Sequence, residues 1–104
     1  MYARVNTFQG PPENADQALK TVREQVIPTV RSIPGNAGII SLVDRATGKS
    51  IGITLWNTEE DLRNSEQTAG GVRQQSADDS ESRVVSVERF EVTDIVLEGQ
   101  PATA

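Results

Sequence analysis

The sequence predicts an α+β protein in which one four-stranded antiparallel sheet carries helices on one face. Apolar residues alternate at every second position in four segments, which is the period of a β-strand. They recur at spacings of three and four in two further segments, which is the period of an amphipathic helix. The predicted order is strand, helix, strand, strand, helix, strand. Because 104 residues are enough for one domain, we expect a single domain over residues 1–98 and a C-terminal tail over residues 99–104.

The first strand is predicted over residues 2–8, YARVNTF, and QGPPEN ends it because two prolines and a glycine cannot continue a sheet ladder. Successive side chains of a strand point to opposite faces. One face therefore carries small side chains (Ala3, Val5 and Thr7) and the other carries larger ones (Tyr2, Arg4, Asn6 and Phe8).

A helix is expected to start at Asn14, which is a suitable N-cap residue. Its apolar stripe consists of Ala15, Ala18, Leu19, Val22, Val26, Ile27 and Val30. Pro28 removes the hydrogen bond to the carbonyl of Glu24, so we expect a kink or a break there. The segment IPGNAG ends the helix, and Gly35 is suited to a left-handed cap.

Two strands follow as a hairpin around ATGK, over residues 39–44 and 51–56. Thr58 is expected to cap the second helix, whose thin apolar stripe is Leu62, Ala69 and Val72. The pair Gly70 and Gly71 is expected to weaken or break that helix, at about 1 kcal/mol each relative to alanine. The last strand is predicted over residues 83–97. That is longer than an ordinary strand of about five or six residues, and it suggests pairing beyond its own sheet.

The second face of the sheet is expected to be covered by another copy of the chain. Apolar residues lie on both faces of the predicted strands, whereas the two helices can cover only one. Hydrophobic residues make up only 36% of the chain, and the mean hydropathy is −0.42, so the core of a monomer would be thin. We therefore expect a homodimer that associates sheet to sheet.

Composition excludes several classes of function. The chain has no cysteine and no histidine, which excludes disulfides, thiolate zinc sites, imidazole catalysis and histidine-ligated haem. The net charge is −5 without any cluster of lysine or arginine, which argues against nucleic acid and anionic membranes as partners. No segment is apolar enough to span a bilayer, and the N-terminus lacks a signal-peptide pattern, so we expect a cytoplasmic protein.

The segment IPGNAGIISLVDRATGKSIGITLWNTEEDLRNSE, residues 33–66, carries a family resemblance. A Pro-Gly pair precedes an apolar strand, a short turn and a strand ending in Leu-Trp, and an acidic helix start follows. This pattern resembles the antibiotic biosynthesis monooxygenase (ABM) type of the dimeric α+β barrel superfamily, and VERFEV at residues 87–92 is similar to that family's final strand. The resemblance implies a ferredoxin-like βαββαβ subunit that dimerises through its sheet and holds a ligand cavity between sheet and helices.

The resemblance also implies a range of activities. The superfamily includes cofactor-free monooxygenases acting on polyketide anthrones and quinols, haem-degrading monooxygenases and proteins without known activity. The haem-degrading branch uses an Asn, a Trp and a His, and Asn6 and Trp56 fall at similar places here, but the missing His argues against haem degradation. Cofactor-free members use polar residues around an electron-rich phenolic substrate that itself activates oxygen. We therefore expect no cofactor, and a small aromatic ligand of the polyketide or quinol type.

Asn6 and Arg4 are the first candidate catalytic residues. If the larger side chains of the first strand face the helices, Asn6 could donate its amide to a substrate carbonyl or oxyanion, and Arg4 could pair with a phenolate. Tyr2 and Phe8 share this strand face and are candidate substrate-binding residues. The alternative is structural: Arg4 pairs with an acid such as Glu88, and Asn6 bonds to a neighbouring loop.

Trp56 is the third candidate catalytic residue, and Thr54 on the same face is a candidate substrate-binding residue. The indole could stack on a planar ligand. A lone tryptophan at the junction of a strand and a helix could instead be a core anchor or a dimer contact. We expect no metal site, because Glu59, Glu60 and Asp61 are consecutive on a helix and point in different directions.

Three functions stay open: an oxygenase on an aromatic metabolite, a binding protein without chemistry, and a structural dimer. The first two predict a pocket beside Asn6 and Trp56, of about 300 Å³ or more for the oxygenase. The third predicts none.

Overall fold

A computed structural model describes residues 1–99, and it confirms the predicted α+β class. The strands are β1 (Tyr2–Gln9), β2 (Asn36–Asp44), β3 (Lys49–Trp56) and β4 (Arg83–Glu91). They form one antiparallel sheet in the order β2-β3-β1-β4, which is the ferredoxin-like arrangement. Residues 100–104, most of the expected tail, lie outside the described part of the chain.

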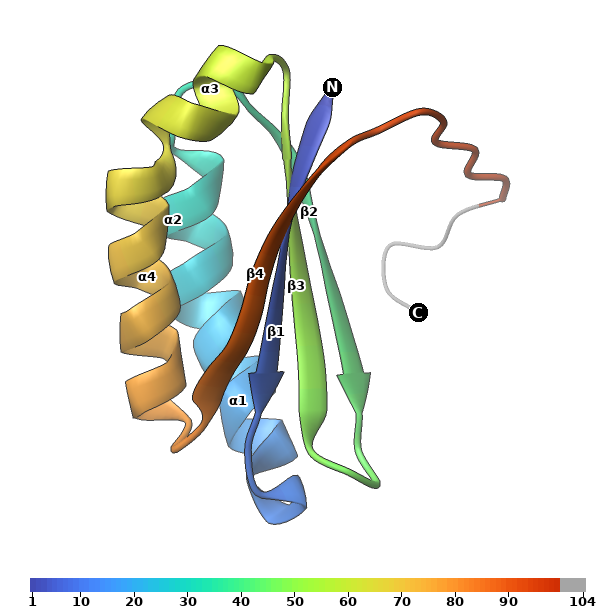
Figure 1. Cartoon of the computed structure of the whole chain (residues 1–104). Coiled ribbons are helices and arrows are strands. Elements are labelled where there is room, and N and C mark those ends of the chain that lie inside the picture. Colours follow the sequence, from blue (N-terminus) through green and yellow to red (C-terminus); the bar gives the residue numbers. More distant parts are fainter. Residues whose placement is uncertain (100–104) are drawn as a thin grey trace.

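All helices lie on one face of this sheet (Figure 1). After a short 3₁₀ turn η1 (Pro12–Asn14) come α1 (Ala15–Thr21), the π-helical turn η2 (Val22–Val26) and α2 (Ile27–Arg31). Between β3 and β4 lie α3 (Glu59–Asn64) and α4 (Glu66–Asp79). The helices and the sheet thus make two layers, and no helix of the described residues lies on the opposite face of the sheet.

Where a kink or a break was predicted at Pro28, the helix forms a π turn just before that residue and continues through it as α2. Proline has no amide hydrogen to bond the carbonyl of Glu24, and the N–H of Ile27 instead bonds the carbonyl of Val22, five residues back. Such wide turns are frequent at functional sites. Asn14 occupies the predicted N-cap position before α1, but its side chain makes no capping bond, and its Nδ2 donates to the carbonyl of Ser80 at 3.5 Å.

The predicted cap at Thr58 is confirmed, since its Oγ1 accepts from the N–H of Asp61 at 3.0 Å. Of the two alternatives expected at Gly70 and Gly71, the break is wrong, because α4 runs through both. Ser65 instead separates α3 from α4, and the two helices run in different directions (Figure 1). Ser65 donates its hydroxyl to the carbonyl of Leu62 at 2.7 Å. A side-chain bond of this kind competes with the helical backbone bonds at that point.

The long last strand predicted over residues 83–97 is also wrong, because β4 ends at Glu91. Among residues 1–99, the only strand beside β4 is β1, whose first residue Tyr2 lies opposite Glu91. One further bond joins the N–H of Val92 to the carbonyl of Met1 at 2.9 Å. Past that point β1 offers no backbone to pair with, and the chain leaves the sheet on the side away from the helices (Figure 1).

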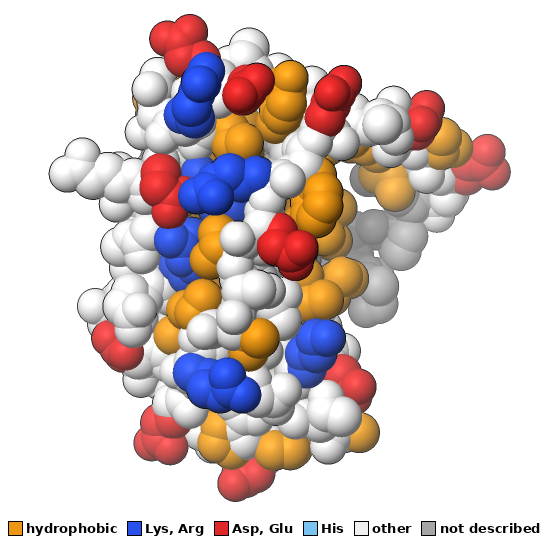
Figure 2. Space-filling view, in the orientation of Figure 1, with side chains coloured by type: hydrophobic (Ala, Val, Ile, Leu, Met, Phe, Trp, Pro, Cys, Tyr) orange, Lys and Arg blue, Asp and Glu red, His pale blue; other side chains and the backbone are white. Residues whose placement is uncertain are grey.

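The core between sheet and helices is centred on Trp56, Val30 and Leu62, all buried. The face without helices exposes large apolar side chains: Ile40 and Leu42 of β2 and Phe90 of β4 are 42%, 47% and 52% exposed. Figure 2 shows hydrophobic side chains on the side of the sheet from which the C-terminal segment departs. No helix among residues 1–99 is both long and apolar enough to cross a bilayer.

Candidate binding cavity between sheet and helices

A cavity of about 80 Å³ lies between the helix-facing side of the sheet and the helical layer. Its apolar wall comes from α1, η2 and α2, chiefly Leu19, Val22, Val26 and Val30. The sheet side includes Ser41 and Val43 of the edge strand β2, which are exposed, so the cavity opens to solvent along that edge. The volume is below the roughly 300 Å³ expected for an aromatic substrate.

Gly52 creates part of this space. It lies in the middle of β3, opposite Asn6 on one side and Ser41 on the other, and it lines the cavity. A Cβ atom built at this position would meet no heavy atom within 4 Å. A glycine inside a strand often marks a place where another group approaches closely, and here it leaves room on the cavity side.

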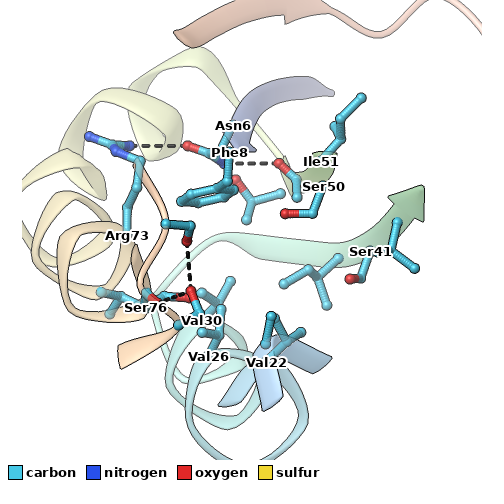
Figure 3. Close-up of a pocket in the computed structure, with 18 of the residues that line it drawn as sticks. Asn6, Phe8, Val22, Val26, Val30, Ser41, Ser50, Ile51, Arg73 and Ser76 are labelled. Carbon is cyan, nitrogen blue, oxygen red and sulfur yellow. Dashed lines mark hydrogen bonds between the residues drawn. The ribbon is translucent and has the colours of Figure 1, made fainter. Parts of the chain in front are cut away.

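The first polar residue of the cavity is Asn6, which is 8% exposed. Its Nδ2 donates to the carbonyl of Gly52 at 2.9 Å, and its Oδ1 accepts from Nη1 of Arg73 at 3.1 Å. Because a guanidinium can only donate, this contact fixes which end of the amide is oxygen. The amide retains one N–H for another acceptor. Figure 3 shows Arg73 reaching from α4 to Asn6, with Val22 and Val26 on the helical side of the cavity.

Arg4 lies deeper, with no exposed surface. Its Nη2 donates to the carbonyl of Leu62 at 2.7 Å and to Oγ of Ser65 at 3.1 Å, which ties β1 to the end of α3. Its Nε lies 2.8 Å from Oε2 of Glu66, as an ion pair without hydrogen-bond geometry. Its Nη1 is buried and has no hydrogen-bond partner within residues 1–99.

Glu66 at the start of α4 is the centre of a charged cluster. Oε1 accepts from Nη2 of Arg73 at 2.8 Å, and Oε2 lies 2.8 Å from Arg4 and 3.4 Å from Arg89 of β4. Three arginines around one carboxylate leave two positive charges uncompensated within this cluster. Basic side chains gather over the border between α4 and β4 in Figure 2.

The cluster shifts the pKa of two of its members. Burial lowers the pKa of Arg4, with Glu66 opposing this and Arg73 and Arg89 adding to it; the guanidinium still stays protonated. For Glu66, burial alone would raise the pKa. The hydrogen bond from Arg73 and the positive charges of Arg4, Arg73 and Arg89 outweigh it, so the pKa of Glu66 falls below its usual 4.5.

Four of the six candidate residues line the cavity: Arg4, Asn6, Phe8 and Thr54. The larger face of β1 therefore does point toward the helices. The suggested structural partner of Arg4 is wrong, because Glu88 lies opposite Val5 on the other face of the sheet, whereas Glu66 makes the ion pair. Asn6 likewise bonds to a strand and a helix and not to a loop.

Trp56 and Tyr2 lie outside the cavity wall. The indole of Trp56 is fully buried, donates from Nε1 to Oγ1 of Thr54 at 3.0 Å, and packs with Val30 and Leu62. The guanidinium carbon of Arg4 lies 5.7 Å from the centroid of the indole ring, within cation–π range. Trp56 thus contacts two cavity residues, Thr54 and Arg4, without lining the cavity itself. Tyr2 lies beside an open groove next to α3 and β4.

Arg73 and Glu66 are the site residues that sequence reasoning missed. Along α4 and its C-cap, the residues Glu66, Ala69, Arg73, Ser76 and Ser80 recur at spacings of three and four, and Ala69 and Ser80 are buried. Charged residues on the buried stripe of a helix are rare unless they are paired. The position of Glu66 and Arg73 on the same stripe as buried residues was therefore the sequence feature that indicated a role for them in the site. Within residues 1–99, no group of three acidic side chains is placed to hold a metal ion.

The family model for antibiotic biosynthesis monooxygenase matches residues 1–70. This match covers more than half of the sequence, and the fold and the cavity between sheet and helices agree with it. The chain therefore belongs to this family.

Two sequence relatives are proteins of Mycobacterium tuberculosis. The uncharacterized protein Rv2558 is 34% identical over 77 residues, which are 74% of this chain and 33% of that protein. The uncharacterized protein Rv2557 is 32% identical over 78 residues, or 75% of this chain and 35% of that protein. The chain thus spans about a third of the length of these relatives.

Solved structures share the fold at low sequence identity. A monooxygenase from the gene ActVA-Orf6 of Streptomyces coelicolor, solved with nanaomycin D, has a TM-score of 0.69 and 12% identity, over 94% of this chain and 92% of that one. SnoaB, a cofactor-independent oxygenase from Streptomyces nogalater, has a TM-score of 0.64 and 17% identity, over 93% and 97%.

Proposed function

We propose that this protein is a cofactor-independent monooxygenase-like protein that takes a small aromatic metabolite of the polyketide or quinol type into the cavity beside Asn6. The observation that supports this most is that the buried residues Asn6 and Arg4, together with the half-buried Arg73, lie in the wall of a mostly apolar cavity. Aromatic ligands are bound in apolar sites with a few fixed polar groups of this kind.

The proposed reaction needs no external reductant. One oxygen atom of O₂ enters the substrate as a carbonyl, and the other leaves as water with the two hydrogens of the oxidised carbon. The enzyme's part is to bind the electron-rich substrate and stabilise negative charge on its oxygen. The free amide N–H of Asn6 and the guanidinium of Arg4 are the proposed donors, since fixed donors in a buried site act strongly on developing charge.

A binding protein without chemistry is the second candidate. Three observations favour it: the cavity is about 80 Å³, Trp56 is fully buried in the core, and Asn6 already holds two hydrogen bonds. A ligand of two or more rings would require side chains such as Phe8 to move.

Oxygen consumption with anthrones and naphthoquinols distinguishes the two candidates. For the oxygenase, Asn6→Ala should lower kcat about a hundredfold, as expected for the loss of one oxyanion donor. Asn64→Ala, at an exposed position of α3, is the matched control and should leave turnover unchanged. Binding that changes the fluorescence of Trp56 without any oxygen uptake would favour the binding protein.

We also propose that the chain forms a homodimer through the face of the sheet that carries no helix. Ile40, Leu42 and Phe90 expose apolar surface there, and large exposed apolar patches mark interaction sites. The cytoplasmic location expected from the sequence stays a prediction.

A further inference from the structure

The charged residues of the cavity wall are of one sign. Arg4 and Arg73 line the cavity, and no Asp or Glu lies among the described residues that do. This contrasts with the chain as a whole, whose net charge is −5. A protein that is acidic overall but has only basic charged residues in the wall of one mostly apolar cavity has a local field that favours an anion there.

The net positive charge of the cluster around Glu66 also favours an anion in the cavity. Glu66 is the only carboxylate in ion-pair contact with Arg4, Arg73 and Arg89 within residues 1–99. Its side chain is 37% exposed, whereas those of Arg4 and Arg73 are 1% and 15% exposed. The positive charges are thus the buried partners, and burying a charge is costly unless it is fully paired.

One donor of the buried arginine is also unused. Nη1 of Arg4 is buried without a hydrogen-bond partner within residues 1–99, although Nη2 of the same guanidinium makes two bonds. An unsatisfied buried donor costs more than an ordinary hydrogen bond contributes. An ionised oxygen would satisfy this donor and offset part of the uncompensated charge.

We propose that the ligand of this cavity is an organic anion: an apolar ring body with one ionised oxygen group, carboxylate or phenolate, held by Arg4 and Arg73. The ring body lies against Val22, Val26 and Val30, in the space left by Gly52. This inference rests on the proposed function in that it uses the same cavity, and it adds the charge of the ligand.

The test compares pairs of ligands that share one ring body and differ in charge and by a single methyl group. Benzoate and 1-naphthoate are titrated against their methyl esters, and 2-hydroxy-1,4-naphthoquinone, ionised at neutral pH, against its methyl ether. Calorimetry and the fluorescence of Trp56 both report binding. Within a pair, the anion should bind at least about tenfold more tightly than its neutral partner, because charge-assisted bonds are roughly twice as strong as neutral ones. The two series separate carboxylate from phenolate as the group preferred.

Arg73→Gln should abolish this preference for the anion while leaving the affinity for the ester within about twofold. Arg89→Gln is the matched control, because Arg89 contacts the same Glu66 but does not line the cavity. It should keep the preference. Arg4→Lys serves as the second variant, since it retains the charge where a neutral residue at this buried position would threaten folding.

Equal affinity for anion and ester overturns the inference, as does an equal loss in Arg73→Gln and Arg89→Gln, or no saturable binding of any anion. Its failure is distinguishable from failure of the proposed function. Turnover of a neutral quinol without a preference for anions would keep the oxygenase and reject the anion. Tight anion binding without oxygen uptake would keep the anionic ligand and reject the oxygenase.

Discussion

Gly52 shapes the cavity because it has no side chain to fill the space there. Asn6 and Arg73 join a strand to a helix across the cavity through a single hydrogen bond of 3.1 Å, and Gly52 accepts the other bond of the Asn6 amide. Gly52 thereby holds Asn6 with its backbone and leaves space with its missing Cβ. A substitution here can fill the cavity without removing any hydrogen bond.

We expect Gly52→Val to abolish binding of the naphthoate probes while the protein stays folded. The side chain enters open space, and valine favours a strand. Gly52→Ala should raise the free energy of unfolding by about 0.4–1 kcal/mol, because it restricts the unfolded chain. Urea denaturation and calorimetric titration measure the two effects.

Gly71→Ala is the control for Gly52. Gly71 is exposed on α4 and lies outside the cavity wall, and a Cβ atom at this position would also meet no heavy atom within 4 Å. The variant should gain stability and keep binding. Unchanged binding in Gly52→Val would place the ligand elsewhere, and a large loss of stability would mean that the space beside Gly52 is not available.

At the scale of elements, one carboxylate holds three of them together. Glu66 of α4 contacts Arg4 of β1 and Arg89 of β4, and Arg4 in turn bonds the end of α3. Periodicity located the elements well, because the apolar stripes of the helices and the alternation of the strands follow from backbone geometry. It misplaced the helix break and the end of β4, since these depend on Ser65 meeting Arg4 and on where β1 begins.

We expect the protein to lose stability in acid through Glu66. The pKa of this carboxyl is lower in the folded protein than its usual 4.5, so the unfolded state binds the proton first as the pH falls. The stabilisation is complete above pH 4.5 and is lost as the pH falls through the folded pKa. Urea midpoints measured from about pH 7 to about pH 3 should therefore fall more steeply for the native protein than for Glu66→Gln.

Glu24→Gln, at an exposed position of the π turn, is the control for this experiment and should follow the native profile. Because Glu66 is more than a third exposed, solvent screens part of its interaction, and the difference is expected to be modest. Parallel profiles for the native protein and Glu66→Gln would contradict the assigned role.

For the whole molecule, the two faces of the sheet differ in what covers them. The helices cover one face (Figure 1), and the other exposes apolar side chains along β2 and β4. Residues 92–97 lie beyond the last strand, and Ile95, Val96 and Leu97 are 48%, 78% and 67% exposed. A second copy of the sheet would bury this surface and provide the stability that a thin core lacks.

We expect light scattering to give twice the 11.3 kDa of the chain. Leu42→Glu places a charge on the exposed face and should shift the protein to the monomer, because burying an unpaired charge in an interface is costly. Thr68→Glu, on the exposed side of α4, is the control and should stay dimeric. A monomeric native protein would reject the dimer.

The sequence by itself determined the two-layer fold, the strand and helix order, the cap at Thr58 and the division of β1 into a face of small and a face of larger side chains. These follow from local periodicity and from the chemistry of single residues, which need no knowledge of distant neighbours. Only the tertiary structure decided that Glu66 and Arg73 meet Arg4 and Asn6, that Gly52 opens the cavity, and that Trp56 lies behind it. Arg73 is 67 residues from Asn6, and contacts at that distance depend on how helices pack across the sheet, which no local pattern specifies.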